Sequence, residues 1–287
     1  MLITQAIKSN FFFKFRFIFL VGIVFCNPFV ALSSSAVFDD LSRLVSYPGK
    51  QEVACPSQDK NTAVLLAIGQ SNIANHGQVK FSTLYPNKVF NYFNGKCYIA
   101  SSPLLGASGE GGEFLTSLGD NLVDFSIYDK VIIISSGINN SMLYRWSQGG
   151  DLNTLLKSIL AEVQTRYKIT EVIFHQGETD FLINTTKEKY IESFHSLLRT
   201  LRPVNKSLPP VYFAIATLCG NNWFPFNSIA QAQYTFADEI NNIYLGANTD
   251  ALIPISERFD VCHFNMIGQL KAAYTYANAI QQNKVFY

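Results

Sequence analysis

Two separate segments of the chain carry side-chain types that together could perform acyl transfer. Ser71 follows the apolar run 63–68 and the glycine Gly69. A buried strand that ends in glycine places the next side chains at the carboxyl edge of a sheet, where α/β enzymes keep their reacting groups. Near the other end of the chain, Asp260 precedes His263 by three positions. We therefore predict a serine nucleophile, a histidine base and an aspartate that orients the base.

The spacing of Asp260 and His263 suits this chemistry. It allows the carboxylate to bind one imidazole nitrogen while the other nitrogen faces Ser71, which fixes the tautomer that a general base needs. Taken alone, an Asp-x-x-His pattern is common at helix starts, and a serine after a glycine is common in turns. The prediction therefore depends on the three residues occurring together.

A third polar segment, 175–180, follows the apolar strand 172–174. The side-chain amide of Gln176 could donate a hydrogen bond to an oxyanion. Glu178 and Asp180 form a carboxylate pair for which acid–base catalysis, a metal site and the pinning of a loop are the alternatives, and we favour loop pinning. His175 is interpreted as a packed residue at the end of the strand.

The motifs Gly-Gln-Ser-Asn at 69–72, His-Gln-Gly-Glu-x-Asp at 175–180 and Asp-x-x-His at 260–263 resemble those of the SGNH (GDSL-type) hydrolase superfamily. The resemblance is closest to its sialate O-acetylesterase-like and acetylxylan esterase-like carbohydrate esterases, and it extends over about 63–276. It implies an α/β three-layer sandwich of flavodoxin-like type, with a doubly wound, mostly parallel five-stranded sheet and a small hairpin insertion. It also implies a serine esterase without metal or organic cofactor, which removes O-acetyl groups from a carbohydrate such as sialic acid, xylan or an envelope glycan.

The resemblance further implies an oxyanion hole. Its expected donors are the backbone N–H groups of Ser71 and of Gly111 or Gly112, together with the amide of Gln176. Glycines directly before a helix let N–H groups approach a negative charge, although a loop that needs glycine for its turns is an equal alternative. Residues expected to contact the substrate are Gln70, Asn72, Asn140, Trp146 and Glu178.

One loop departs from the pattern of the related esterases. These often carry a Gly-Gly pair where this chain has Asn139 and Asn140, followed by a tryptophan at the place of Trp146. The Asn pair leaves the backbone geometry of this loop open. Trp146 is expected either to stack on a sugar or to pack as an ordinary buried indole.

Helices alternate with single strands about five times along the chain, which predicts a parallel sheet covered on both faces. A turn signal at Asn94-Gly95 predicts a hairpin over 89–99. Residues 37–61 are expected to form coil or a short helix that covers the sheet edge. The other expected strands are 63–68, 131–134, 171–174, 211–216 and 251–254, and the expected helices are those ending near 124 and spanning about 152–167, 187–201, 229–244 and 265–281.

Composition restricts the class of protein. With 287 residues, 48% of them hydrophobic and 15% charged, the chain can bury one large core. A net charge of +1 and the lack of charge runs argue against a nucleic-acid partner.

The N-terminus predicts a secretory signal peptide over residues 1–36. Lys8, Lys14 and Arg16 precede the apolar stretch 17–25, and small residues follow through 33–36. We expect cleavage near Ala36, a single domain over 37–287, no stable membrane span after cleavage, and a secreted or periplasmic protein. A membrane anchor is the alternative, but the apolar stretch is short for a span of about 20 residues.

Four cysteines follow the predicted signal peptide: Cys55, Cys97, Cys219 and Cys262. An even number in an exported chain predicts two disulfides. Cys219 follows the strand 211–216 and Cys262 adjoins the predicted base, so both should lie at one sheet edge, which favours the pairs Cys219–Cys262 and Cys55–Cys97. Four buried thiols are the alternative, and the lack of Cys-x-x-Cys or paired His spacing argues against zinc.

Two further functions stay open at this stage. One is a lipase-like or acyl-transferring member of the same superfamily, and the other is a glycan-binding module without turnover. The sequence makes no prediction of oligomeric state.

Overall fold

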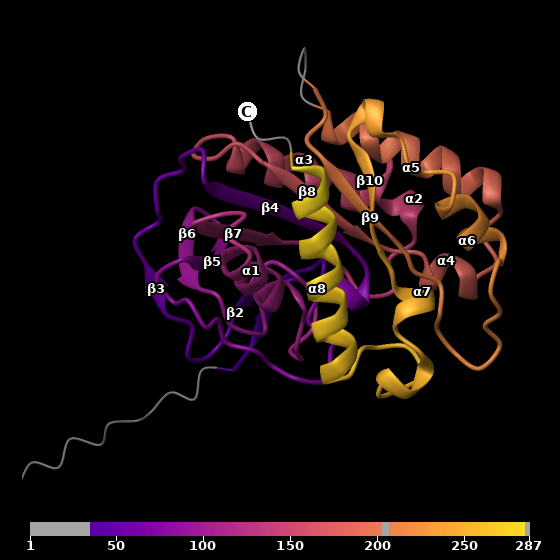
Figure 1. Ribbon diagram of the computed structural model, residues 1–287, viewed down its shortest axis with the longest axis horizontal. Helices are drawn as coiled ribbons and strands as arrows, with labels where there is room; N and C mark the ends of the chain where they lie inside the picture. Colours follow the sequence, from indigo (N-terminus) through magenta and orange to yellow (C-terminus); the bar gives the residue numbers. More distant parts are fainter. Residues whose placement is uncertain (1–34, 203–206, 285–287) are drawn as a thin grey trace, which may run out of the picture. The chain divides into compact units, whose positions relative to one another are not determined.

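The computed structural model describes residues 35–202 and 207–284 (Figure 1). Most of the predicted signal peptide therefore lies outside the described residues. The main sheet contains β3 (Glu52–Val53), β4 (Thr62–Gly69), β5 (Val89–Phe93), β6 (Lys96–Ile99), β7 (Lys130–Ser135), β8 (Glu171–His175), β9 (Val211–Ile215) and β10 (Ile243–Asn248). Among the described residues these eight strands are arranged in the order β10-β9-β8-β4-β7-β5-β6-β3. Two short strands, β1 (Val37–Phe38) and β2 (Leu44–Ser46), form a separate small sheet.

Strand direction divides the main sheet into two parts. All neighbouring strands from β10 to β5 run parallel. The pairs β5–β6 and β6–β3 are antiparallel. The predicted hairpin over 89–99 is present and turns at Asn94 and Gly95, which both have positive φ. It is not an insertion, however, because β5 pairs directly with β7 and so extends the central sheet.

Helices cover both faces of the sheet, as the alternation of elements predicted. One face carries α1 (Leu115–Asp124) and α8 (Met266–Asn283), which lies in front of the sheet in Figure 1. The other face carries α3 (Asp151–Val163) and α5 (Lys187–Leu201). Alternate residues of β4 enter the two cores, with Leu66 on the α3–α5 side and Leu65 on the α1–α8 side. The strand is apolar throughout because both of its faces are buried.

The three-layer α/β class is confirmed, but the predicted number of five strands is wrong. One reason is the pairing of the hairpin, described above. The other lies near the C-terminus, where 229–244 was expected to be one helix and 251–254 the last strand. Instead, α6 (Ser228–Gln233) is short, the last strand is β10, and 251–254 overlaps α7 (Thr249–Leu252).

Short helices complete the edge of the sheet at which the strands end. They are α2 (Leu143–Trp146), α4 (Glu178–Leu182) and the 3₁₀ helices η1 (Ser71–Ile73) and η3 (Ile255–Glu257), whereas η2 (Glu239–Asn241) directly precedes β10 and so lies at the opposite edge. The central strand β4 lies between β7 and β8, so the chain winds to one side of β4 and later continues on the other. In open α/β sheets, ligands bind outside the carboxyl ends of the strands at such a switch point. Ser71 follows β4 directly and lies at this point.

Both predicted disulfides are present. Cys55 is bonded to Cys97, and Cys219 is bonded to Cys262. Residues 37–61 lie at the sheet edge as expected, but they contain the short strands β1, β2 and β3 where coil or a short helix was expected, and β3 pairs with β6. Of the helices in the described ranges, none has the length and apolar character needed to cross a membrane.

Candidate active site

Ser71 begins the 3₁₀ helix η1 directly after β4, and its side chain is 2% exposed. Gly69 allows this turn, since it has φ 140° and any Cβ there would overlap the carbonyl of His175 on the neighbouring strand. Within the described chain, neither the hydroxyl nor the backbone N–H of Ser71 makes a hydrogen bond. Both groups are therefore available to a substrate.

Asp260 and His263 form the predicted hydrogen bond, with 2.6 Å between Asp260 Oδ2 and His263 Nδ1. The other carboxylate oxygen accepts the backbone N–H groups of Cys262 and His263. Partial burial alone would raise the pKa of Asp260, but the hydrogen bonds and charge of His263 bring that pKa below its usual value. Asp260 is therefore an anion at neutral pH and fixes the proton of the imidazole on Nδ1. Nε2 of His263 has no partner in the described part of the chain.

Two aromatic rings flank the His263 imidazole. The ring of His76 stacks at a centroid distance of 5.7 Å, and that of Phe259 at 6.0 Å. Burial, with the nearby charge of His263, lowers the pKa of His76 to about 4. His76 is thus neutral at neutral pH and adds no like charge beside the imidazole. It also hydrogen-bonds Ser108 Oγ at 3.2 Å.

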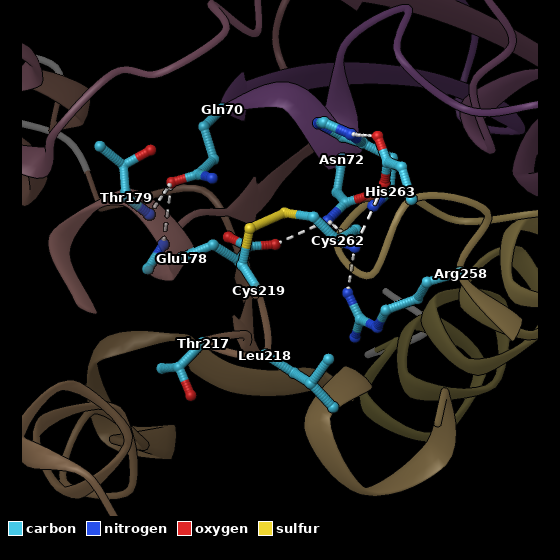
Figure 2. The surroundings of a disulfide bond; sticks show 12 residues. Gln70, Asn72, Glu178, Thr179, Thr217, Leu218, Cys219, Arg258, Cys262 and His263 are labelled. Atoms are coloured by element: carbon cyan, nitrogen blue, oxygen red, sulfur yellow. Dashed lines mark hydrogen bonds and ion pairs between the residues drawn. A yellow bond between two sulfur atoms is a disulfide. The ribbon is translucent and has the colours of Figure 1, made fainter. Parts of the chain in front are cut away.

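Asn72 joins the serine turn to the loop that carries His263 (Figure 2). Its Nδ2 donates to the backbone carbonyl of Cys262 at 3.3 Å, and its Oδ1 accepts the backbone N–H of Phe264 at 3.2 Å. The residue after Ser71 therefore contacts the chain on both sides of His263. Although Ser71 and His263 make no direct hydrogen bond, their backbones are held next to each other. Such bonds are often long in unliganded enzymes and shorten when substrate binds.

The glycine block does not supply free donors, which corrects one prediction. The N–H of Gly111 donates to Asn75 O and that of Gly112 to Gly77 O, both at 2.7 Å. A Cβ on Gly112 would lie 1.7 Å from the carbonyl oxygen of Val79. These glycines let two backbone segments approach closely, so the alternative structural interpretation of the block holds.

Gln176 is also occupied elsewhere. It is fully buried, and its Nε2 donates to the carboxylate of Asp180 and to the carbonyl of Ser141. Its Oε1 accepts the hydroxyl of Tyr190 at 2.8 Å. All its hydrogen-bonding capacity is used inside the protein, so the prediction of an oxyanion donor at Gln176 is not supported by its position.

Four of the five expected substrate-contacting residues are buried and bonded within the protein. Gln70 Oε1 accepts N–H groups of the β8–α4 turn, including that of Thr179 at 3.1 Å. Glu178 Oε1 accepts Asn72 Nδ2 at 2.8 Å, and Trp146 donates its indole N–H to Ser141 Oγ. Their positions give no support to the expected substrate contacts, because these side chains bond to the protein around Ser71. The fifth residue, Asn140, is exposed and has φ 53°.

The side chain of Glu178 is buried, with 1% of its surface exposed, and it is nevertheless charged. Burial alone would raise its pKa, but the charge and hydrogen bond of His175 and the amide of Asn72 hold that pKa below the usual value. The loop-pinning interpretation of the carboxylate pair fits, since Asp180 accepts the N–H of Leu143 at 2.8 Å. No group of three or more His, Cys, Asp or Glu suited to a metal ion occurs among the residues described.

Three residues near the loop that carries His263 were not among the predicted site residues. His76 and Phe259 flank the imidazole, and Phe259 is 46% exposed. Asn139 was noted as a departure from the pattern and as a polar residue on a loop expected at the rim of the site. Its backbone N–H donates to Ser108 Oγ at 2.8 Å, while its partly exposed side chain has no partner among the described residues. A polar loop residue directly after a buried strand was the available signal for Asn139.

The three-layer sheet, with polar residues collected where its central strand ends, defines an α/β esterase of the SGNH type. The profile of one family, described as carbohydrate esterase, sialic acid-specific acetylesterase, matches residues 61–282. The chain belongs to this family and is a carboxylic ester hydrolase acting on acetylated carbohydrate. This agrees with the resemblance noted in the sequence.

Solved structures with the same fold include three relevant proteins. A protein from Arabidopsis thaliana shares 17% identity at a TM-score of 0.63, over 78% of this chain and 98% of its own. A carbohydrate acetylesterase from Xanthomonas citri, XAC1771, shares 17% identity at a TM-score of 0.53, over 77% of this chain and 56% of its own. A variant of Axe2, an acetyl-xylooligosaccharide esterase from Geobacillus, shares 13% identity at a TM-score of 0.50, over 80% of this chain and 98% of its own. Comparison with curated proteins finds no match.

Proposed function

We propose that this esterase releases acetate from an O-acetylated carbohydrate through a triad of Ser71, His263 and Asp260. The observation that carries the proposal is the 2.6 Å contact between His263 Nδ1 and Asp260 Oδ2, on a loop bonded to the residue that follows Ser71. This arrangement leaves Nε2 of the imidazole as the nitrogen available to a serine hydroxyl.

The reaction has two halves. His263 Nε2 takes the proton of Ser71 as Oγ attacks the acetyl carbonyl, and the imidazolium then gives that proton to the departing sugar oxygen. Water, activated by the same nitrogen, hydrolyses the acetyl-serine and releases acetate. Asp260 stabilises the imidazolium in both halves. The pKa of about 4 at His76 keeps a second positive charge away from it.

For the oxyanion, we propose the backbone N–H of Ser71 and the side-chain amide of Asn139 as donors. Both lack partners in the described residues, in contrast to Gly111, Gly112 and Gln176. A donor of this kind typically contributes about 10²- to 10³-fold in rate. Asn139→Ala should therefore lower kcat on every acetyl ester by about this factor.

For the sugar, we propose that its ring packs on Phe259. This side chain is 46% exposed beside the imidazole, whereas Trp146 is fully buried. Sugar binding often combines an apolar ring face with a few polar groups, which Asn139 and Asn140 can supply. An extracellular or periplasmic glycan is the proposed target, which the two disulfides support.

The triad is tested with Ser71→Ala and His263→Ala. Each should lower acetate release from a small aryl acetate by about 10⁴- to 10⁶-fold, because the nucleophile and the base act as a unit. Circular dichroism serves as the control for folding. Near-normal turnover by either folded variant would refute the triad.

The substrate is tested with a panel of acetylated sugars and with esters of increasing acyl length. Preference for acetylated sugars over long-chain esters supports the proposal, and the reverse preference would favour the lipase-like alternative. Sugar binding without turnover would favour the glycan-binding module. Transfer of acetyl to an added alcohol in place of water would favour acyl transfer.

Phe259→Ala separates sugar recognition from chemistry. It should lower kcat/KM for an acetylated oligosaccharide by about 3- to 30-fold, from the loss of one aromatic contact. Turnover of vinyl acetate, which is too small to need the ring, should change little. Ile240→Ala, at a side chain 95% exposed on η2, is the matched control. An equal effect on both substrates would exclude a sugar contact at Phe259.

A further inference from the structure

The loop 258–264 carries the predicted aspartate and histidine, and its internal bonds keep these two together. The backbone N–H of Phe259 donates to His263 O at 2.9 Å and closes the loop. Asp260 accepts both the ring and the backbone N–H of His263. None of these bonds determines where the loop lies relative to Ser71, so its placement must come from contacts outside it.

The first outside contact is the disulfide between Cys219 and Cys262, directly before His263 in the chain (Figure 2). It joins the loop to the segment that follows β9. Next to it, the N–H of Gly220 donates to Val261 O at 3.1 Å. Val261 is β-branched and adopts φ 61°. A β-branched residue keeps such a conformation only where its surroundings hold it, which the two neighbouring attachments do here.

The second outside contact is Asn72, which bonds the backbone of Cys262 and of Phe264. It is 3% exposed, and its amide is oriented in turn by the buried Glu178. The carbonyl of Cys262 also accepts Arg258 NH1 at 2.7 Å. The backbone at 262 is therefore attached from the β9 side by the disulfide and from the β4 side by Asn72.

We propose that Cys219, Cys262 and Asn72 are positioning residues for catalysis, which together hold the imidazole of His263 at the hydroxyl of Ser71. We call these three residues the loop clamp. Their effect is on the alignment of base and nucleophile, and therefore on kcat, beyond any contribution to folding. The inference builds on the proposed triad.

The second disulfide provides a matched control. The sequence separation is 43 for Cys219–Cys262 and 42 for Cys55–Cys97, so the two bonds restrict the unfolded chain almost equally. Cys55 and Cys97 lie at the β3–β6 edge of the sheet, whereas β9 lies near the opposite edge. Removal of either disulfide should therefore lower the melting temperature by a similar amount. Only the Cys219–Cys262 disulfide lies next to the proposed site.

The experiment compares the double variants C219A/C262A and C55A/C97A on a small aryl acetate. We expect kcat of C219A/C262A to fall about 10- to 100-fold, since small misplacements of reacting groups have effects of this size. Its KM should change by less than about twofold, and C55A/C97A should retain the wild-type kcat at a temperature below both transitions. The acid limb of the pH–rate profile should stay in place, because the contact between Asp260 and His263 lies within the loop.

Asn72→Ala is the second variant and leaves both disulfides intact. It should lower kcat by a similar factor, and its effect should be non-additive with that of C219A/C262A, because both anchors hold one element. If C219A/C262A does not fold, the kcat of Asn72→Ala alone tests the loop clamp.

Equal kcat values for the two disulfide variants, or an unchanged kcat in Asn72→Ala, would overturn the loop clamp. A shift of the acid limb would also overturn it, since the change would then lie within the aspartate–histidine pair. These results are distinct from failure of the proposed function, in which Ser71→Ala would retain activity whatever the state of the clamp.

Discussion

The residues on either side of the proposed nucleophile differ from it in what they contact. Among the described residues the hydroxyl of Ser71 has no hydrogen-bond partner, whereas Gln70 binds the β8–α4 turn and Asn72 binds the loop 258–264. Both amides are buried, and each bonds to a different segment of the protein. The motif Gly-Gln-Ser-Asn thus combines one reacting group with two groups that join separate segments around it. This explains why polar residues next to a nucleophile need not contact substrate.

The lowered pKa of His76 predicts how the stability of the protein changes in acid. Burial lowers this pKa in the folded protein to about 4, below the usual histidine value of 6.5, so the unfolded chain binds more protons between these values. The contribution of His76 to the free energy of unfolding is therefore fully present above about pH 6.5 and is lost as the pH falls toward 4. His76→Asn should show a smaller fall in melting temperature between pH 7 and 4 than the wild type. Calorimetry across this range, with the exposed His195 replaced as a control, measures the difference. Parallel curves for wild type and His76→Asn would contradict the pKa shift.

The sequence indicated the contact between Asp260 and His263 better than it indicated the partners of the other proposed site residues. Asp260 and His263 are close in sequence, so their contact is local and could be predicted from spacing. The direction of Gln176 depends on the turn at Gly177, where φ is 147°, and on the distant partner Tyr190. Such long-range partners leave no periodic pattern in the chain. The same reason applies to Trp146, whose burial depends on the packing of α2 against α3 and α5.

At the level of elements, long periodic segments were predicted well and short apolar ones were not. Helix α5 occupies 187–201 as expected, with Thr186 as its N-cap. The helix expected over 229–244 ends early at Gln233, and its last two residues begin β10 after Asn242 turns the chain with φ 60°. The segment 251–254 was assigned to a strand, but Asn248 caps α7 by accepting the N–H of Ala251. Short apolar runs do not distinguish helix from strand, and the caps decide.

Helix α8 begins directly after the loop 258–264. The N-cap of this helix, Asn265, allows a prediction about stability. Asn265 Oδ1 accepts the N–H groups of Ile267 and Gly268, whereas Thr186 Oγ1 accepts one N–H at 3.3 Å. Asn265→Ala should therefore cost about 1 to 2 kcal/mol of unfolding free energy, and Thr186→Ala about 0.5 kcal/mol. Denaturant unfolding at constant m-value measures both. A larger loss in Thr186→Ala would show that the number of capped N–H groups is not what determines the cost.

For the whole molecule, the sheet gathers distant segments at one edge and the disulfides close long loops around it. The serine turn, the 136–141 loop and the catalytic loop come together because β4 lies between β7 and β8. Contacts from Asn72 and Cys219 then attach the loop 258–264 at this edge. The other disulfide joins the β3 segment to β6, far along the sheet.

This arrangement predicts that the two disulfides stabilise the fold equally while only one affects turnover. In the chain-entropy relation, closing a loop of this length contributes about 4 kcal/mol. For a domain of this size, each kcal/mol corresponds to about 2 to 4 °C, so C55A/C97A should melt roughly 8 to 16 °C below the wild type. Scanning calorimetry of the oxidised proteins measures this, with C219A/C262A expected to fall by a similar amount. A fall below about 3 °C in C55A/C97A would mean that the β3–β6 edge is ordered without its disulfide, and that loop length alone does not set the contribution of these bonds.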